Sequence, residues 1–233
     1  MPHHDIAAEM ITRFYDELSK KKNVKRIYLL APDHFRRARN WAAVCDTDWQ
    51  VAGSGTPKAD AGAVNRLKSL NIVEARSDMF ACEHGITVHI PFIARYFKDA
   101  AVVPIVLRPD IPDIALLSIR NAIREMAGED ELIILSMDFS HYKTPEEMAE
   151  EDKRSLCALT NMNIMKLSRV DVDARRAAAL VTLLFRDRGA VRGEVLERSD
   201  SSEVLGRRVE SGTSYATVIY RKKHKMDARP VNE

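Results

Sequence analysis

Strand-length apolar runs, separated by helical patterns, constrain the fold of this chain more than any other feature. Residues 24–31, 101–107 and 131–138 each contain a nearly continuous apolar stretch. Such runs are typical of parallel strands that are buried on both faces beneath covering helices. Because amphipathic patterns lie between them, the sequence predicts an α/β fold: a single domain with a mostly parallel central sheet flanked by helices.

The spacing of apolar residues predicts helices over 5–22, 58–70, 85–97 and 112–127, and two or three more between 145 and 188. In the first helix the expected inward side chains are Ile6, Met10, Phe14 and Leu18. In the helix over 112–127 they are Ile114, Leu117, Ile123 and Met126.

Three further strands are expected at 43–51, 191–198 and 213–220. Pro104 interrupts the run at 101–107. Because proline lacks the N–H that a sheet ladder needs, it indicates an edge strand or a bulge there. We expect residues 1–220 to form the domain and residues 221–233 to form a solvated basic and polar tail.

Composition excludes several classes of protein. The formal net charge is only +2 over 233 residues, which gives no support for a nucleic-acid or membrane-surface role. No apolar run approaches the roughly 20 residues of a membrane span. Three cysteines without a CxxC pair exclude a disulfide scaffold and a cysteine-built zinc site, and they favour a reducing cytoplasm. The first residues lack the basic and apolar regions of a signal peptide.

Histidines that follow strands provide the candidate site. His34 follows the strand at 24–31, and His141 follows the strand at 131–138. Ligands of open α/β sheets bind beyond the carboxyl ends of strands, so these two side chains could share one crevice. A single histidine in such a place is more often a loop residue with one hydrogen bond. Asp33 and Asp138 could orient the imidazoles, although Asp138 could equally cap its turn.

Four short elements occur in a fixed order along nearly the whole chain. They are Pro2-His3, Leu30-Ala-Pro-Asp-His34, Glu83-His-Gly-Ile-Thr-Val-His-Ile-Pro-Phe92 and Ser136-Met-Asp-Phe-Ser-His-Tyr142, followed by a closing Ser211-Gly-Thr-Ser-Tyr-Ala-Thr217. Together they resemble the Memo family, also called the AmmeMemoRadiSam system protein B family. The resemblance implies a fold similar to that of class III extradiol ring-cleavage dioxygenases, which are non-haem iron enzymes that open catechols.

The resemblance also implies a pocket. The family's three pocket histidines correspond to His3, His34 and His141, while Asp173 stands where the family has a cysteine. His3, His34 and Asp173 would then form the two-histidine, one-carboxylate set of non-haem Fe(II) oxygenases. By the same analogy His141 would be the catalytic acid/base residue.

Several alternatives stay open at this point. Asp173 precedes an alanine-rich helix and could simply cap it, in which case Asp171 is the alternative ligand. Glu83 and His84 are expected to line the same pocket. Family members have a strand that leads into the Pro-His element, so a short variant and a start upstream of Met1 are both compatible with the resemblance.

The expected cofactor is a divalent metal, with Fe(II) favoured and copper or zinc as alternatives. The expected ligand is a small anionic or aromatic molecule, because a site with two neutral imidazoles and one carboxylate leaves a divalent metal with positive charge. The alternative function is a non-catalytic metal-, ligand- or partner-binding protein on the same scaffold. The family's bacterial name implies a partner protein of a radical-SAM system.

Overall fold

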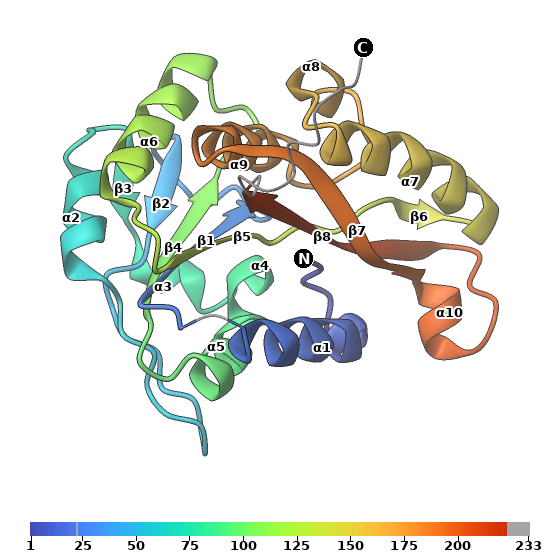
Figure 1. The fold of residues 1–233 in the computed structure, drawn as a ribbon, viewed down its shortest axis with the longest axis horizontal. Coiled ribbons are helices and arrows are strands. Elements are labelled where there is room, and N and C mark those ends of the chain that lie inside the picture. Colours follow the sequence, from blue (N-terminus) through green and yellow to red (C-terminus); the bar gives the residue numbers. More distant parts are fainter. Residues whose placement is uncertain (22, 223–233) are drawn as a thin grey trace, which may run out of the picture.

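A five-stranded sheet forms the centre of the computed structural model, which describes residues 1–21 and 23–222 (Figure 1). The strand order is β3-β2-β4-β1-β5, and only the β2–β4 pair is antiparallel. The strands are β1 (Arg26–Pro32), β2 (Ala42–Val44), β3 (Val73–Ala75), β4 (Ala101–Leu107) and β5 (Glu131–Leu135). The predicted mostly parallel sheet is therefore confirmed.

Helices cover both faces of this sheet. The helices are α1 (Ala8–Ser19), which follows a 3-10 turn at Asp5–Ala7, α2 (Ala61–Lys68), α3 (Ser77–Phe80), α4 (His84–Thr87), α5 (Ile90–Tyr96), α6 (Asp113–Met126), α7 (Pro145–Thr160), α8 (Ile164–Leu167), α9 (Arg175–Asp187) and α10 (Ser201–Leu205). Side chains of α2, α6 and α9 pack in one apolar core, and those of α1, α4 and α5 in a second. Alternate residues of β1 enter the two cores: Leu30 enters the first and Leu29 the second.

A second, antiparallel sheet was not predicted as a separate unit. It consists of β6 (His141–Lys143), β7 (Ala190–Asp200) and β8 (Gly212–Lys222) in the order β6-β8-β7. The long β7–β8 ribbon lies beside the central sheet and crosses beneath α7 (Figure 1). The two final strands were expected, but sequence patterns did not reveal that they pair with each other outside the central sheet.

The inward faces of two helices differ from those predicted. In α1 the buried side chains are Met10, Ile11 and Tyr15. In α6, Ile114 is 75% exposed and Leu117 is 39% exposed. The buried residues of α6 are Ala115, Leu116, Ile119, Ala122 and Ile123. Met10 and Ile123 are buried as predicted, but in α6 the buried face contains Leu116 and Ile119 instead of Ile114 and Leu117.

The prediction from Pro104 is wrong, because β4 is an internal strand without a bulge. Pro104 stays in register with Leu29 of β1. On its other side β4 pairs with β2 only over Ile105–Leu107, and the next bridge joins Val102 to Ala59. Pro104 lies between these two pairings, so among the described residues no neighbouring strand requires its missing N–H.

The ends of other predicted helices and strands also differ from those in the structure. The helix predicted over 85–97 is divided into α4 and α5, and the strand predicted over 43–51 is reduced to β2. Residues 223–233 of the predicted tail lie outside the described residues, while β8 continues to Lys222. None of the described helices is both long enough and apolar enough to cross a bilayer.

A buried carboxylate joins the second sheet to α7 and provides a stability test. Asp152 accepts hydrogen bonds from the hydroxyls of Ser140 (3.2 Å) and Ser214 (2.8 Å), and from Nε of Arg198 (2.9 Å). We expect Asp152→Ala to lower the free energy of unfolding by about 3 kcal/mol, because it leaves a guanidinium and two hydroxyls without this acceptor. Urea denaturation measures the change.

Glu150→Ala is the matched control on the same helix, because among the described residues Glu150 forms only exposed ion pairs, with Lys153 and Arg154. Its effect should stay within about 0.5 kcal/mol. Equal effects of the two substitutions would contradict the structural role of the buried carboxylate.

Candidate metal centre

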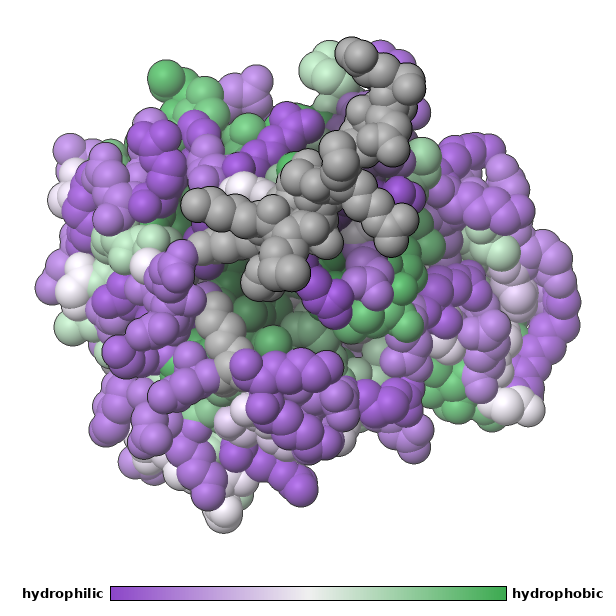
Figure 2. All heavy atoms as spheres, viewed as in Figure 1, coloured by the Kyte–Doolittle hydropathy of each residue, from purple (hydrophilic) through white to green (hydrophobic). Residues whose placement is uncertain are grey.

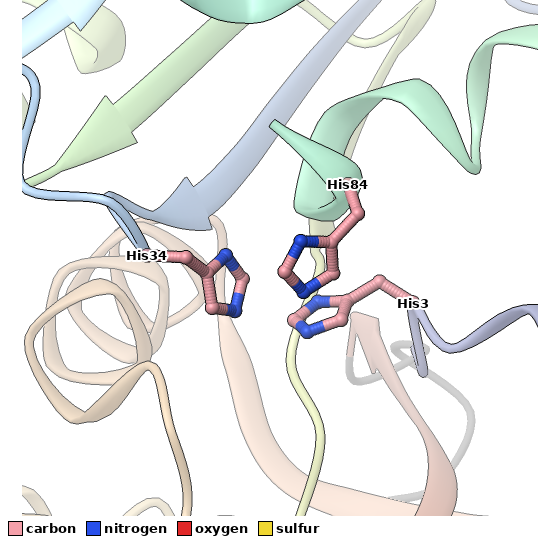
Figure 3. A group of neighbouring side chains, drawn as sticks. All are labelled: His3, His34 and His84. Atoms are coloured by element: carbon pink, nitrogen blue, oxygen red, sulfur yellow. The ribbon is translucent and has the colours of Figure 1, made fainter. Parts of the chain in front are cut away.

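Three histidines from separate segments face one another near the ends of β1 and β5. Figure 3 shows His3 on the N-terminal segment, His34 on the loop after β1 and His84 at the start of α4. The His34 and His84 ring centroids are 3.9 Å apart, and the His3 ring lies 4.8 Å from His34 and 5.1 Å from His84. The parallel pairing of β1 with β5 brings the His34 loop next to the segment that holds His3.

His3 is buried and held on two sides. Its Nδ1 lies 2.9 Å from the hydroxyl of Ser136, directly after β5. Its backbone N–H donates to Oδ1 of Asp138 at 3.0 Å. The remaining ring nitrogen, Nε2, lies 3.0 Å from Oδ2 of Asp173. The Ser136 contact therefore leaves Nε2 directed at the carboxylate.

Glu83 orients His34 in a similar way. The buried Glu83 carboxylate lies 2.5 Å from Nδ1 of His34 and accepts the backbone N–H of His34 at 3.1 Å. It also caps α4 by accepting the Gly85 N–H at 3.1 Å. Nε2 of His34 lies 3.6 Å from the same Asp173 oxygen that contacts His3. Glycine is required at 85, because a Cβ there would lie 2.9 Å from the Ala31 Cβ.

Asp173 does not cap the following helix. The N-cap of α9 is Ala174, which makes no side-chain cap bond, so the capping alternative is wrong for this residue. Both carboxylate oxygens of Asp173 instead accept the Asp138 N–H at 3.2 Å. The alternative ligand, Asp171, is paired with Nζ of Lys143 at 2.7 Å. The structure thus brings His3, His34 and Asp173 together.

Asp33 has a different role from the one expected. Its carboxylate accepts the backbone N–H groups of Arg37 (3.0 Å) and Ala38 (2.8 Å), so it organises the loop after His34. Glu83 is the carboxylate that orients the ring of His34. Asp138 holds the backbone of His3, and its Oδ2 lies 3.7 Å from Nε2 of the same residue.

His84, predicted only to line the pocket, is closer to the other two histidines than this implied. The only sequence signal for the position of His84 is that it directly follows Glu83 in the family-like element.

His141, the predicted acid/base residue, begins β6 opposite Thr213, and its ring lies 6.0 Å from that of Tyr142. Its acid/base role stays a prediction.

The carboxylates dominate the titration of the two inner histidines. Burial alone would lower the pKa of His34, but its bonds to Asp173 and Glu83 outweigh burial and raise it to about 9. The pKa of His3 is raised as well, because Asp138 and Asp173 oppose the effect of burial. Burial would raise the pKa of Asp173, but the two imidazoles hold it far below its usual range.

His84 behaves in the opposite way. Burial and the charges of His34 and His3 lower the pKa of His84 to about 4. Its side chain is 46% exposed and its nearest carboxylate oxygen, on Glu83, is 3.9 Å away. His84 is therefore neutral near pH 7 and open to solvent, whereas His3 and His34 are held by carboxylates.

Two overlapping sets of ligand atoms could hold a metal ion. The atoms of His3, His34 and His84 lie within 4.8 Å of one another, as do those of His3, Asp138 and Asp173. Imidazole nitrogen and carboxylate oxygen suit iron, copper and zinc, so the donor types alone do not select the metal. The residues that surround these atoms fix two of the rings before any metal binds.

Comparison with known proteins supports the family resemblance seen in the sequence motifs. The family model for Memo-like proteins matches residues 1–219. The chain belongs to the Memo-like family.

Curated relatives of this Memo-like protein include a MEMO1 family protein of Nitrosopumilus maritimus, which is 25% identical over 194 residues, or 79% of this chain and 70% of the relative. A MEMO1 family protein of Ignicoccus hospitalis is 25% identical over 202 residues, covering 82% and 70% of the two chains. One of Thermotoga petrophila is 25% identical over 200 residues, covering 83% and 71%.

The pKa of His34 predicts how metal affinity depends on pH. Because this pKa is about 9 in the metal-free protein, a metal ion that uses Nε2 must displace a proton at pH 7. We expect the affinity for Co²⁺ to rise about tenfold per pH unit, or more steeply where His3 also loses a proton, and to level off above about pH 9. Titrations followed by cobalt absorption at pH 6.5, 7.5, 8.5 and 9.5 measure the slope. A flat profile across this range would exclude His34 as a ligand.

Proposed function

We propose that this Memo-like protein is a metal-dependent oxidoreductase of dioxygenase-like type that acts on a small anionic or aromatic substrate. The proposed metal is Fe(II), and the proposed ligands are His3, His34 and Asp173. One observation carries this proposal: Nε2 of His3 and Nε2 of His34 approach the same Asp173 oxygen, at 3.0 and 3.6 Å. Two histidines and one carboxylate with open positions are the donor set of non-haem Fe(II) oxygenases.

The surroundings of these residues fit a metal ion. Ser136 and Glu83 occupy Nδ1 of the two rings, which directs both Nε2 atoms toward one point. Hydrogen bonds of this kind fix the tautomer and raise the basicity of a ligating imidazole. The Asp138 N–H holds Asp173 from the backbone, so the carboxylate keeps lone pairs for a cation.

When bound, Fe(II) would supply open coordination positions at which O2 and a substrate meet. His84 is placed to meet a substrate beside that point, because its ring lies 3.9 Å from that of His34 and is partly exposed. Because the ring of His84 is neutral near pH 7, it would accept a hydrogen bond from a substrate hydroxyl. His141 remains the candidate for the acid/base role, as the family analogy implies.

Iron loading tests the proposal directly. Protein purified without oxygen and reconstituted with Fe(II) should hold about one iron per chain, and a catechol should stimulate its O2 uptake. We expect Asp173→Ala to lose most of the bound iron, because it removes the carboxylate that both imidazoles approach. Metal analysis and an oxygen electrode provide the two measurements.

Asp171→Ala is the matched control, since it removes a nearby carboxylate that is already paired with Lys143. It should keep its iron. Absence of stoichiometric iron in the unaltered protein would overturn the proposal. Stoichiometric iron without O2 uptake would leave the metal site intact and favour a non-catalytic binding protein.

A further inference from the structure

An exposed aromatic ring stands beside the histidines of the candidate metal centre. Phe35 directly follows His34, and half of its side chain is exposed. Its ring centroid lies 6.0 Å from that of His84, at an interplanar angle of 77°, and 6.4 Å from that of His34. Figure 3 shows that these two imidazoles face each other at the ends of their segments. An exposed ring that can stack on an aromatic ligand therefore lies beside both imidazoles.

An arginine without an ion pair lies on this aromatic ring. The guanidinium carbon of Arg37 is 5.4 Å from the centroid of Phe35, within cation–π range. Among residues 1–21 and 23–222, no carboxylate lies within ion-pair distance of Arg37 or of Arg39. Many arginines elsewhere in this part of the chain are paired, as Arg76 is with Asp78. The charge of Arg37 is thus available to an incoming anion.

The loop that carries these side chains is held in place by its backbone. The buried carboxylate of Asp33 accepts the N–H groups of Arg37 and Ala38, at 3.0 and 2.8 Å. Further along, Glu74 accepts the Asn40 N–H at 2.9 Å. Arg36, directly before the first of these anchored residues, has a φ of 50°, a region that non-glycine residues rarely adopt. A strained backbone beside a site persists only when its surroundings fix it.

We propose that Phe35 and Arg37 select the ligand of the metal centre and that this ligand is a single-ring aromatic carboxylate. The ring of the ligand would pack against Phe35, and its carboxylate would meet the guanidinium of Arg37. A solvated arginine needs no anchored loop and no aromatic support, whereas Arg37 has both. This inference rests on the proposed metal site, because the opposite end of the ligand faces His34 and His84.

Two probes that differ only in a carboxylate test the inference. The protein is first loaded with Co²⁺, which reports metal binding by its absorption. Calorimetry then compares 3,4-dihydroxybenzoate with catechol, both of which offer the same two hydroxyls. We expect the carboxylate compound to bind about tenfold more tightly, as a charge-assisted hydrogen bond implies.

Arg37→Ala should reduce this preference to about one, while the affinity for catechol stays within about twofold. Phe35→Ala should weaken both probes, since it removes the ring that both pack against. Arg95→Ala is the matched control, because Arg95 is also exposed and also lies on an aromatic ring, 5.3 Å from the centroid of Tyr96. It should leave the preference unchanged.

The outcomes separate the two proposals. A protein that fails to bind Co²⁺ would overturn the metal site, and this inference with it. Normal Co²⁺ binding with equal affinity for the two probes would overturn the inference alone. Retention of the carboxylate preference in Arg37→Ala would also overturn it, because another group would then have to recognise the anion.

Discussion

Asp138 connects the three segments on which the candidate site depends. Its carboxylate holds the backbone of His3, its N–H donates to Asp173, and its carbonyl accepts the Asp173 N–H at 3.3 Å. The N-terminal segment, the turn after β5 and the loop before α9 are thereby fixed relative to one another. Because Asp138 itself is buried, three residues after the parallel strand β5, the sheet determines where these segments meet.

The same contacts create an electrostatic problem that a cation resolves. Asp138 and Asp173 are neighbouring carboxylates in a largely buried position, and burial raises the pKa of Asp138. In the metal-free protein the pKa of His34 is about 9, so a proton on His34 balances part of this negative charge near pH 7, and the carboxylates raise the pKa of His3 as well. A divalent cation at Nε2 would replace that proton and balance the carboxylates in the same place. The arrangement therefore binds either protons or a metal, in competition.

Much of the scaffold could be predicted from local sequence. The buried strands β1, β4 and β5 follow from apolar runs with few alternatives, and their carboxyl ends predicted that His34 would lie in a crevice. The face of α6 was not predictable in this way, because large apolar residues such as Ile114 occur on its exposed side. Amphipathic spacing reports which residues are apolar, but tertiary packing decides which of them are covered.

The candidate site, too, could be predicted from the sequence only in part. His3, His34 and Asp173 were expected together only because a family resemblance supplied the long-range information that spacing lacks. The proximity of His84 could not be predicted from periodicity, since it depends on Glu83 contacting His34 and capping α4 at once. A single buried carboxylate that makes both contacts produces no periodic pattern that sequence analysis could detect. Asp33 was predicted to orient the imidazole of His34 because it is adjacent in sequence. Adjacency does not reveal that its carboxylate instead accepts the backbone N–H groups of Arg37 and Ala38.

The two ligand sets at this site differ in how firmly they are held, and this difference bears on the choice of metal. Asp173 is fixed by a backbone N–H and touches both inner imidazoles, whereas His84 is partly exposed and lies 3.9 Å from its nearest carboxylate oxygen. A preorganised carboxylate lowers the charge of the bound ion, while a third imidazole would leave it unchanged. Asp173 is therefore better held than His84, which favours the proposed ligands His3, His34 and Asp173 over a set of three histidines. That leaves His84 beside the metal position as a neutral imidazole, able to hydrogen-bond a substrate without being needed as a ligand.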